Sequence, residues 1–203
     1  MGQPGCVERG KMSRGKVRRT LIGIVLASSL ALVSTGVAYT PPCQQADRDP
    51  ISPPPDLKVG PQVGQIAPDF TLPVLGVADA VTLSEVRGCV VLLEFWASWC
   101  TYCRGSSAYL EQLALRYHDQ GLVVLGVSLD RLPEAARAFV AAVGLSEVVP
   151  LWGSFEEALA VVRAYRVATI PHVFLIDRRG VIRYAGHPAG LAPELIEYWL
   201  AVR

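Results

Sequence analysis

Hydrophobic residues from about residue 63 onward follow two spacings, one typical of strands and one of helices. Two apolar runs, at residues 89–96 with one acidic residue inside it and at 122–128, are short, as in strands that are buried on both faces. Between them, apolar residues recur every three or four positions from Ser106 to His118, and Gly121 follows. This pattern predicts an amphipathic helix that ends near the glycine.

Shorter elements are expected on either side of this strand–helix–strand core. The expected strands lie at residues 70–72, 81–83, 148–151, 173–176 and 181–184, and the expected helices at 133–143, 155–165 and 192–202. The order of the elements predicts an α/β domain with a central mixed β-sheet flanked by helices. An N-terminal β-hairpin and a helix–strand insert at about residues 131–152 extend this core.

The first 38 residues have the pattern of an export signal. Six Lys and Arg against one Glu give this segment a charge of +5, and an apolar run and small residues follow up to Ala38. Cleavage after Ala38 would remove the segment. Alternatively, the 19 residues from Leu21 to Tyr39 would stay as a membrane anchor. Both alternatives predict that the domain is exported, to the periplasm or to the extracytoplasmic face of the membrane.

A proline-rich segment follows the signal. Seven prolines fall within residues 39–62, and such a run favours an extended polyproline conformation that contributes no core. We therefore divide the chain into a signal peptide or anchor at 1–38, a linker at 39–62 and one folded domain at 63–203.

Charge and cysteine content exclude some classes of function. Residues 39–203 carry 13 basic and 17 acidic side chains, a charge of −4, which does not support nucleic-acid binding. Five cysteines are too few for a disulfide-dense scaffold, and only Cys100 and Cys103 have a spacing that implies chemistry. We interpret Cys43 as a linker cysteine and Cys89 as a small buried hydrophobic residue at a strand start.

Cys100 and Cys103 lie where the first buried strand passes into the helix. The C-x-x-C spacing is expected to put both sulfurs on the first helical turn, close enough to form a disulfide. Unpaired N–H groups and the positive end of the helix dipole stabilise a thiolate there. We therefore predict that Cys100 is a partly ionised nucleophile that attacks disulfides, and that Cys103, one turn deeper, is the resolving thiol.

A zinc site and a purely structural disulfide are the alternatives for this pair. Zinc needs four ligands, but the chain has no second C-x-x-C and its three histidines are scattered, so we expect no metal site. A structural disulfide suits an exported protein, but one that closes so short a loop constrains little of the unfolded chain. In the redox interpretation the cysteines carry the electrons, so no cofactor is expected.

Glu94 is an acidic residue within the apolar strand, six positions before Cys100. A buried charge there costs free energy unless it is paired or protonated, and burial raises the pKa of a carboxyl group toward a value useful to a general base. The alternative is that Glu94 points out of the sheet and pairs with an arginine. We favour the functional interpretation, because buried acids cluster at sites.

The stretch Trp99–Cys103, with the pattern W-C-x-x-C, resembles the active site of the thioredoxin superfamily. In particular, it is similar to the exported TlpA/ResA-like (redoxin) thiol-disulfide oxidoreductases. The resemblance extends from about Val63 to the C-terminus and includes the motif at residues 63–70 and the segment at 170–177. It implies a thioredoxin-like fold, with both the N-terminal hairpin and the insert.

The resemblance also implies roles for particular residues. Glu94 would accept the proton of Cys103 and return it, through water if needed. Pro171 would be a cis proline packed against the disulfide, although sequence alone leaves an ordinary trans proline at a strand start open. The backbone of Ile170 would pair with an extended substrate, and the proline ring would keep metal-binding groups away from the sulfurs.

The residues around the cysteines are expected to contact substrate. Trp99 would be an apolar lid beside the site, and Thr101 and Tyr102 would tune thiolate stability and hence the reduction potential. Well-known relatives often carry proline where this chain has Tyr102. That difference leaves the direction open between reductant and oxidant, and the family favours a reductant.

The resemblance implies an enzyme that reduces disulfides of exported proteins, for example apocytochrome c. A membrane electron donor of the DsbD/CcdA type would reduce the enzyme again, and a monomer is the default. The rivals are a disulfide-forming oxidase, a thiol peroxidase, and a non-enzymatic module that binds thiols or chaperones a metal. The peroxidase pattern P-x-x-x-[ST]-x-x-C fails, because Leu93 and Ala97 occupy its proline and hydroxyl positions.

Overall fold

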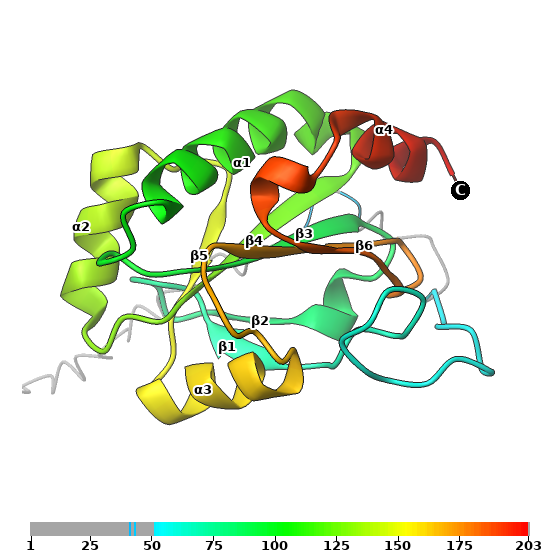
Figure 1. Ribbon diagram of the computed structural model, residues 1–203, viewed down its shortest axis with the longest axis horizontal. Helices are drawn as coiled ribbons and strands as arrows, with labels where there is room; N and C mark the ends of the chain where they lie inside the picture. The colour runs from blue at the N-terminus through cyan, green and yellow to red at the C-terminus, as the bar shows by residue number, and fades with distance from the viewer. Residues whose placement is uncertain (1–40, 42, 44–50, 203) are drawn as a thin grey trace, which may run out of the picture. The chain divides into compact units, whose positions relative to one another are not determined.

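The computed structural model describes residues 41, 43 and 51–202 (Figure 1). The predicted signal or anchor at 1–38 and much of the predicted linker lie outside these residues, so both stay predictions. In the described part of the chain, no helix is long and apolar enough to cross a membrane.

Five strands form the central sheet in the order β5-β4-β3-β6-β7. Strand β3 pairs in parallel with β4 and antiparallel with β6, while β5 and β7 join the two edges in parallel and antiparallel pairing. The strands are β3 (Val90–Trp96), β4 (Leu122–Ser128), β5 (Val149–Leu151), β6 (His172–Ile176) and β7 (Ile182–Gly186). The predicted mixed sheet is confirmed, with β3 at its centre.

Helices cover the sheet in two layers, as Figure 1 shows. Helices α1 (Cys103–Tyr117) and α4 (Pro193–Ala201) lie over one face, with α2 (Pro133–Val143) beside α1. Helix α3 (Phe155–Ala164) lies over the other face, together with a small antiparallel sheet of β1 (Thr71–Pro73) and β2 (Ala80–Thr82). The predicted hairpin and the insert, which supplies α2 and β5, are both present. Together these elements form a thioredoxin-like α/β fold.

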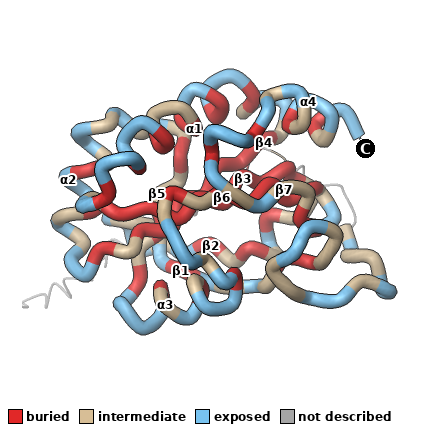
Figure 2. Tube along the Cα trace, viewed as in Figure 1, coloured by how far each residue is buried: buried red, intermediate tan, exposed pale blue. Residues whose placement is uncertain are grey.

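The alternation of side chains along β3 assigns each residue to one face of the sheet. Val91, Leu93 and Phe95 belong to the hydrophobic cluster that packs against α3 and the hairpin. The residues between them face the α1 layer, where Val90 and Leu92 pack with α1 and α4. All seven residues of β3 are buried, which the red tube at the centre of Figure 2 shows. The alternation therefore turns Glu94 toward α1.

A second disulfide joins Cys43 to Cys89 at the start of β3. Their Cα atoms are 5.2 Å apart although the residues are 46 positions apart in the sequence. Interpreting Cys43 as an ordinary linker cysteine and Cys89 as only a buried hydrophobic residue was therefore wrong. Cys89 is indeed fully buried, but no local spacing pointed to its partner. The disulfide and the hydrogen bonds of Lys58 and Gly60 to Ile66 attach part of the predicted linker to the domain.

Replacing Cys43 by serine should lower the free energy of unfolding by roughly 3–4 kcal/mol, because the disulfide restricts a long loop of the unfolded chain. Denaturant unfolding of the oxidised protein and the C43S variant measures the difference. The matched control is wild type and C43S under full reduction, where the difference should vanish. Equal unfolding midpoints of the oxidised proteins would contradict the prediction.

Candidate active site

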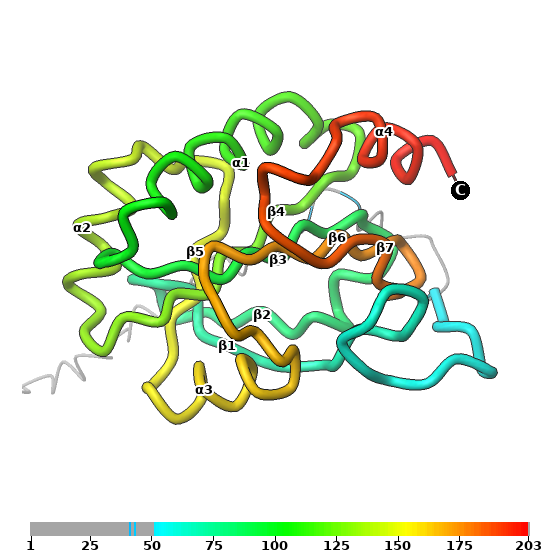
Figure 3. The backbone as a smooth tube through the Cα atoms, viewed as in Figure 1, coloured from blue at the N-terminus to red at the C-terminus, as the bar shows by residue number. Residues whose placement is uncertain are grey.

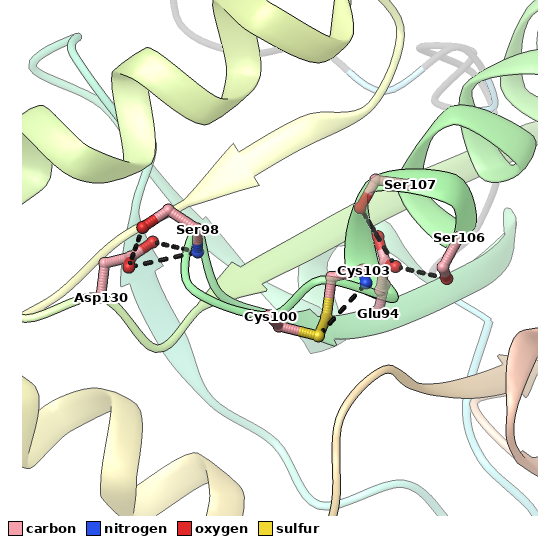
Figure 4. Close-up of a disulfide and its surroundings, with 7 residues drawn as sticks. All are labelled: Glu94, Ser98, Cys100, Cys103, Ser106, Ser107 and Asp130. Carbon is pink, nitrogen blue, oxygen red and sulfur yellow. Dashed lines mark hydrogen bonds between the residues drawn. A yellow bond between two sulfur atoms is a disulfide. The ribbon is translucent and has the colours of Figure 1, made fainter.

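The Cys100–Cys103 disulfide lies between the carboxyl end of β3 and the start of α1 (Figure 4). Helix α1 begins at Cys103, so Cys100 lies in the preceding turn. The expectation that both sulfurs sit on the first helical turn is wrong in this detail. The backbone N–H of Cys103 nevertheless donates to the Sγ of Cys100 at 3.2 Å. The helix start therefore supplies the donor that stabilises negative charge on this sulfur.

The two cysteines differ in accessibility. Cys100 is 8% exposed and Cys103 is fully buried. The first cysteine is thus more enclosed than expected in the oxidised pair, but it remains the only one of the two that a partner sulfur can approach. This asymmetry agrees with an attacking Cys100 and a resolving Cys103, and those roles stay predictions.

Glu94 lies fully buried behind the disulfide. Its carboxylate accepts hydrogen bonds from Ser106 Oγ at 2.8 Å and from Ser107 Oγ at 3.0 and 3.2 Å. Burial raises the pKa of Glu94 to about 7, and the two hydroxyl donors oppose that rise because they stabilise the charged form. The alternative of an outward Glu94 paired with an arginine is wrong. A carboxyl group that titrates near neutral pH is suited to general acid–base work.

Ser106 and Ser107 were not identified from the sequence. Both lie in the first two turns of α1 and bind Glu94 on the sheet, on a side of the helix where most of the buried residues are apolar. The signal was present, because two adjacent serines interrupt the apolar stripe opposite an acid in the neighbouring strand. The two serines can be recognised as partners of Glu94 only once it is known that this part of α1 packs against β3 next to Glu94.

Asp130 was also missed, and it holds the chain just before the cysteines. Its buried carboxylate accepts the backbone N–H of Ser98 at 3.0 Å, the Oγ of Ser98 at 2.7 Å and the Oγ of Ser128 at 2.9 Å. Figure 4 shows this group on the opposite side of Cys100 from Glu94. The bonds tie the turn that carries Cys100 to the end of β4.

Ile170 and Pro171 reach the site from the segment before β6. The peptide bond between them is cis, as the resemblance implied. The Ile170 side chain packs on the apolar cluster that contains both Cys100 and Cys103. Ile170 is thus brought next to the disulfide. The packing of Pro171 on the disulfide and the contact of both residues with substrate stay predictions.

Three residues expected to meet substrate lie at the surface around Cys100. Trp99 is 68% and Tyr102 80% exposed, and Thr101 is exposed as well. Trp99 borders an open hollow of about 540 Å³ that Leu132 and Phe155 also line. The side chains next to the nucleophile therefore offer an apolar surface that a protein partner can contact.

No group of three or more His, Cys, Asp or Glu side chains within the described ranges is arranged to hold a metal ion. The described residues bring together at the site two cysteine sulfurs, one buried acid and the hydroxyl groups that bind it.

Comparisons with known proteins agree on the class of enzyme. The thiol-disulfide oxidoreductase ResA of Geobacillus kaustophilus is 32% identical over 121 residues, which are 60% of this chain and 67% of the relative. The thioredoxin-like protein YneN of Bacillus subtilis is 33% identical over 129 residues, 62% of this chain and 72% of that protein. The fold, the C-x-x-C disulfide and these relatives place the chain among the thiol-disulfide oxidoreductases.

A solved structure supports the same assignment. It is described as a thiol:disulfide interchange protein DsbE from Chlorobium tepidum, and it matches with a TM-score of 0.62 and 34% identity over 69% of this chain and 99% of that chain. The profile of the AhpC/TSA family matches residues 63–185. The chain belongs to the AhpC/TSA family.

Proposed function

We propose that this protein is exported and reduces disulfides in other exported proteins. The observation that carries the proposal is the arrangement of three groups. Cys100 is the more exposed cysteine and its sulfur accepts a helix N–H, Cys103 is fully buried, and Glu94 is buried with a pKa of about 7. Apocytochrome c is an example of the proposed substrate class. The active unit would be a monomer, held at the membrane if the N-terminal segment is not cleaved.

The reaction moves two electrons from the dithiol to the substrate. The Cys100 thiolate attacks one sulfur of a substrate disulfide, forms a mixed disulfide and releases the other substrate thiolate. Glu94 takes the proton of Cys103, and the resulting thiolate attacks Cys100 and releases the second substrate thiolate. A membrane dithiol donor of the DsbD/CcdA type then reduces the Cys100–Cys103 disulfide.

One electrostatic feature of the site, the buried acid beside the cysteines, favours a reductant over an oxidant. A strongly oxidising disulfide requires that its reduced form be stabilised, which in practice means a stabilised thiolate. Glu94 places a carboxyl group behind the pair, and its charged form disfavours a neighbouring thiolate. The nearby cation Arg104 is directed to the carbonyl oxygen of Ala142, at 3.4 Å, and to the ring of Phe139.

The Cys43–Cys89 disulfide supports export. Disulfides away from a redox site form and persist in oxidising compartments and are rare in the cytosol. A fully buried Cys89 bonded to a residue 46 positions earlier is of this kind. It agrees with the basic and apolar N-terminal pattern.

The reduction potential of the Cys100–Cys103 couple tests the direction. It is measured by equilibration against glutathione, in the C43S/C89S variant so that a single couple remains. A value near or below about −220 mV is expected of a reductant. A value near about −120 mV would instead assign the same residues to a disulfide-forming oxidase. Absence of a reversible two-electron couple would refute redox catalysis and favour a binding module.

A further inference from the structure

An open hollow of about 540 Å³ lies next to the turn that carries Cys100. Three stretches of the chain line it: the turn before α1 with Trp99, the connection from β4 to α2 with Leu132, and the start of α3 with Phe155. These large apolar side chains are left uncovered, since Trp99 is 68%, Leu132 65% and Phe155 40% exposed. Apolar side chains that converge in this way and are rimmed by polar groups mark an interaction surface.

Asp130 holds the three stretches together. Its carboxylate accepts the N–H and the hydroxyl of Ser98 in the turn, a group that Figure 4 shows beside Cys100. Its carbonyl oxygen accepts the indole N–H of Trp152 at 2.9 Å, from the connection between β5 and α3. The capping box of Ser154 then fixes the start of α3. The hollow is therefore formed without a partner, which lowers the free energy cost of binding one.

Arg131 places a positive charge at the rim of the hollow. Its guanidinium group lies over the ring of Phe155, 4.9 Å from the ring centroid. In the part of the chain that the structure describes, Arg131 forms no ion pair with an acidic side chain. Glu134 on the following helix pairs with Arg137 instead, at 3.5 Å. A carboxylate of a partner can therefore pair with Arg131 directly beside an apolar surface.

We propose that this hollow is a specificity subsite that takes a large apolar side chain of the substrate polypeptide, with an acidic residue next to it. The proposal rests on the proposed function, because the occupant belongs to the chain whose cysteine is bonded to Cys100. Trp99 directly precedes Cys100, and residues of an extended segment are spaced by about 3.3 Å, so a side chain a few positions from that cysteine reaches the hollow. The apolar side chain packs on Leu132 and Phe155, and the carboxylate pairs with Arg131.

The test compares three peptides as substrates of the reduced full-length protein. Each peptide has one intramolecular disulfide, and both of its cysteines are flanked by Leu–Asp, by Leu–Lys or by Ala–Asp. The second-order rate constant should be about tenfold higher for Leu–Asp than for Ala–Asp, because the leucine side chain leaves water. It should be up to about fivefold higher for Leu–Asp than for Leu–Lys, which is the range of an exposed charge pair.

Two kinds of variant assign these preferences to the hollow. R131E should reverse the charge preference, so that the Leu–Lys peptide becomes the better substrate. F155A and L132A should each remove most of the advantage of leucine over alanine. Every comparison is a ratio of two peptides on one protein, so a change in the reactivity of Cys100 cancels. An unchanged charge preference in R131E, or an unchanged leucine advantage in both other variants, would overturn the proposal.

R137E is the matched control for the charge reversal. Arg137 is also an exposed arginine near the start of α2, but it lines a different hollow. Its replacement should leave the order of the three peptides as in the wild type. The same reversal in R137E and R131E would contradict the subsite, because the net charge of the domain would then decide the preference.

A second measurement separates the subsite from the proposed function. Dye-labelled peptides with serine in place of both cysteines are bound to the oxidised protein, and fluorescence anisotropy gives their Kd. The order of affinities should match the order of rates, including the reversal in R131E. Binding in this order without reduction of any peptide would refute the proposed function alone, and equal binding of all three would refute the subsite alone. A dimer in sedimentation that F155A dissociates would make a second copy of the chain the occupant and overturn the proposal.

Discussion

Replacing Cys100 by serine should reduce the rate of disulfide reduction by about three orders of magnitude or more, since the attacking sulfur is lost. Cys100 is the partly exposed sulfur of the pair, and it receives the N–H at the start of α1. A serine hydroxyl at this position does not ionise near neutral pH as a thiol does, so it cannot replace the thiolate as the nucleophile. Reduction of a disulfide-bonded protein or peptide, followed by thiol release, measures the effect.

The companion variant, C103S, should behave differently. It retains the attacking sulfur and loses the resolving one, so it should accumulate a covalent mixed disulfide that non-reducing electrophoresis reveals. The C43S/C89S variant is the control and should keep its activity, because that disulfide is at the other end of β3. Turnover by C100S close to that of the wild type would rule out Cys100 as the nucleophile.

Replacing Glu94 by glutamine should slow resolution of the mixed disulfide about 100-fold at pH 7, the lower range for loss of a general base. Burial raises the pKa of Glu94 to about 7. Only the deprotonated carboxylate can take the proton of Cys103, so the wild-type rate should rise as the pH passes upward through about 7. Glutamine does not titrate, so the rise of the rate with pH near 7 should be absent from the variant. Single-turnover rates from pH 5 to pH 9 measure both effects.

E197Q is a suitable control for this comparison. Glu197 is a carboxylate on α4 that accepts a hydrogen bond from Tyr117, at the far end of α1 from the cysteines. Its replacement should leave the rise of the resolution rate near pH 7 unchanged. If E94Q kept both the wild-type rate and its rise with pH near 7, another group would have to be the base.

The expected strands and helices of the domain were largely right, because their signals are local. Apolar runs and helical spacing depend on residues within one element, and they placed β3, α1 and β4 to within a few residues. The main shift lies at the start of α1, which begins at Cys103 and leaves Cys100 in a turn. Element ends are set by capping and tertiary contacts, which spacing does not encode.

The site was predicted only as far as its residues carry a local signal. The C-x-x-C pair and the acid in an apolar strand stand out by type and position. The partners that give them their environment do not. Ser106 and Ser107 meet Glu94 across 12 and 13 residues, and Asp130 meets Ser98 across 32. Such pairs form only after the elements have packed.

The sequence by itself determined the class of the fold and the position of the two C-x-x-C cysteines, and it singled out Glu94 as an acid within an apolar strand. Each of these follows from the order of residues within one or two neighbouring elements. The face to which Glu94 points was decided by the packing of β3. The tertiary structure alone decided which side chains bind the Glu94 carboxylate, and that Cys43 pairs with Cys89. The reason is physical: hydrogen bonds and disulfides depend on the distance between atoms, and packing brings together residues that lie far apart in the chain.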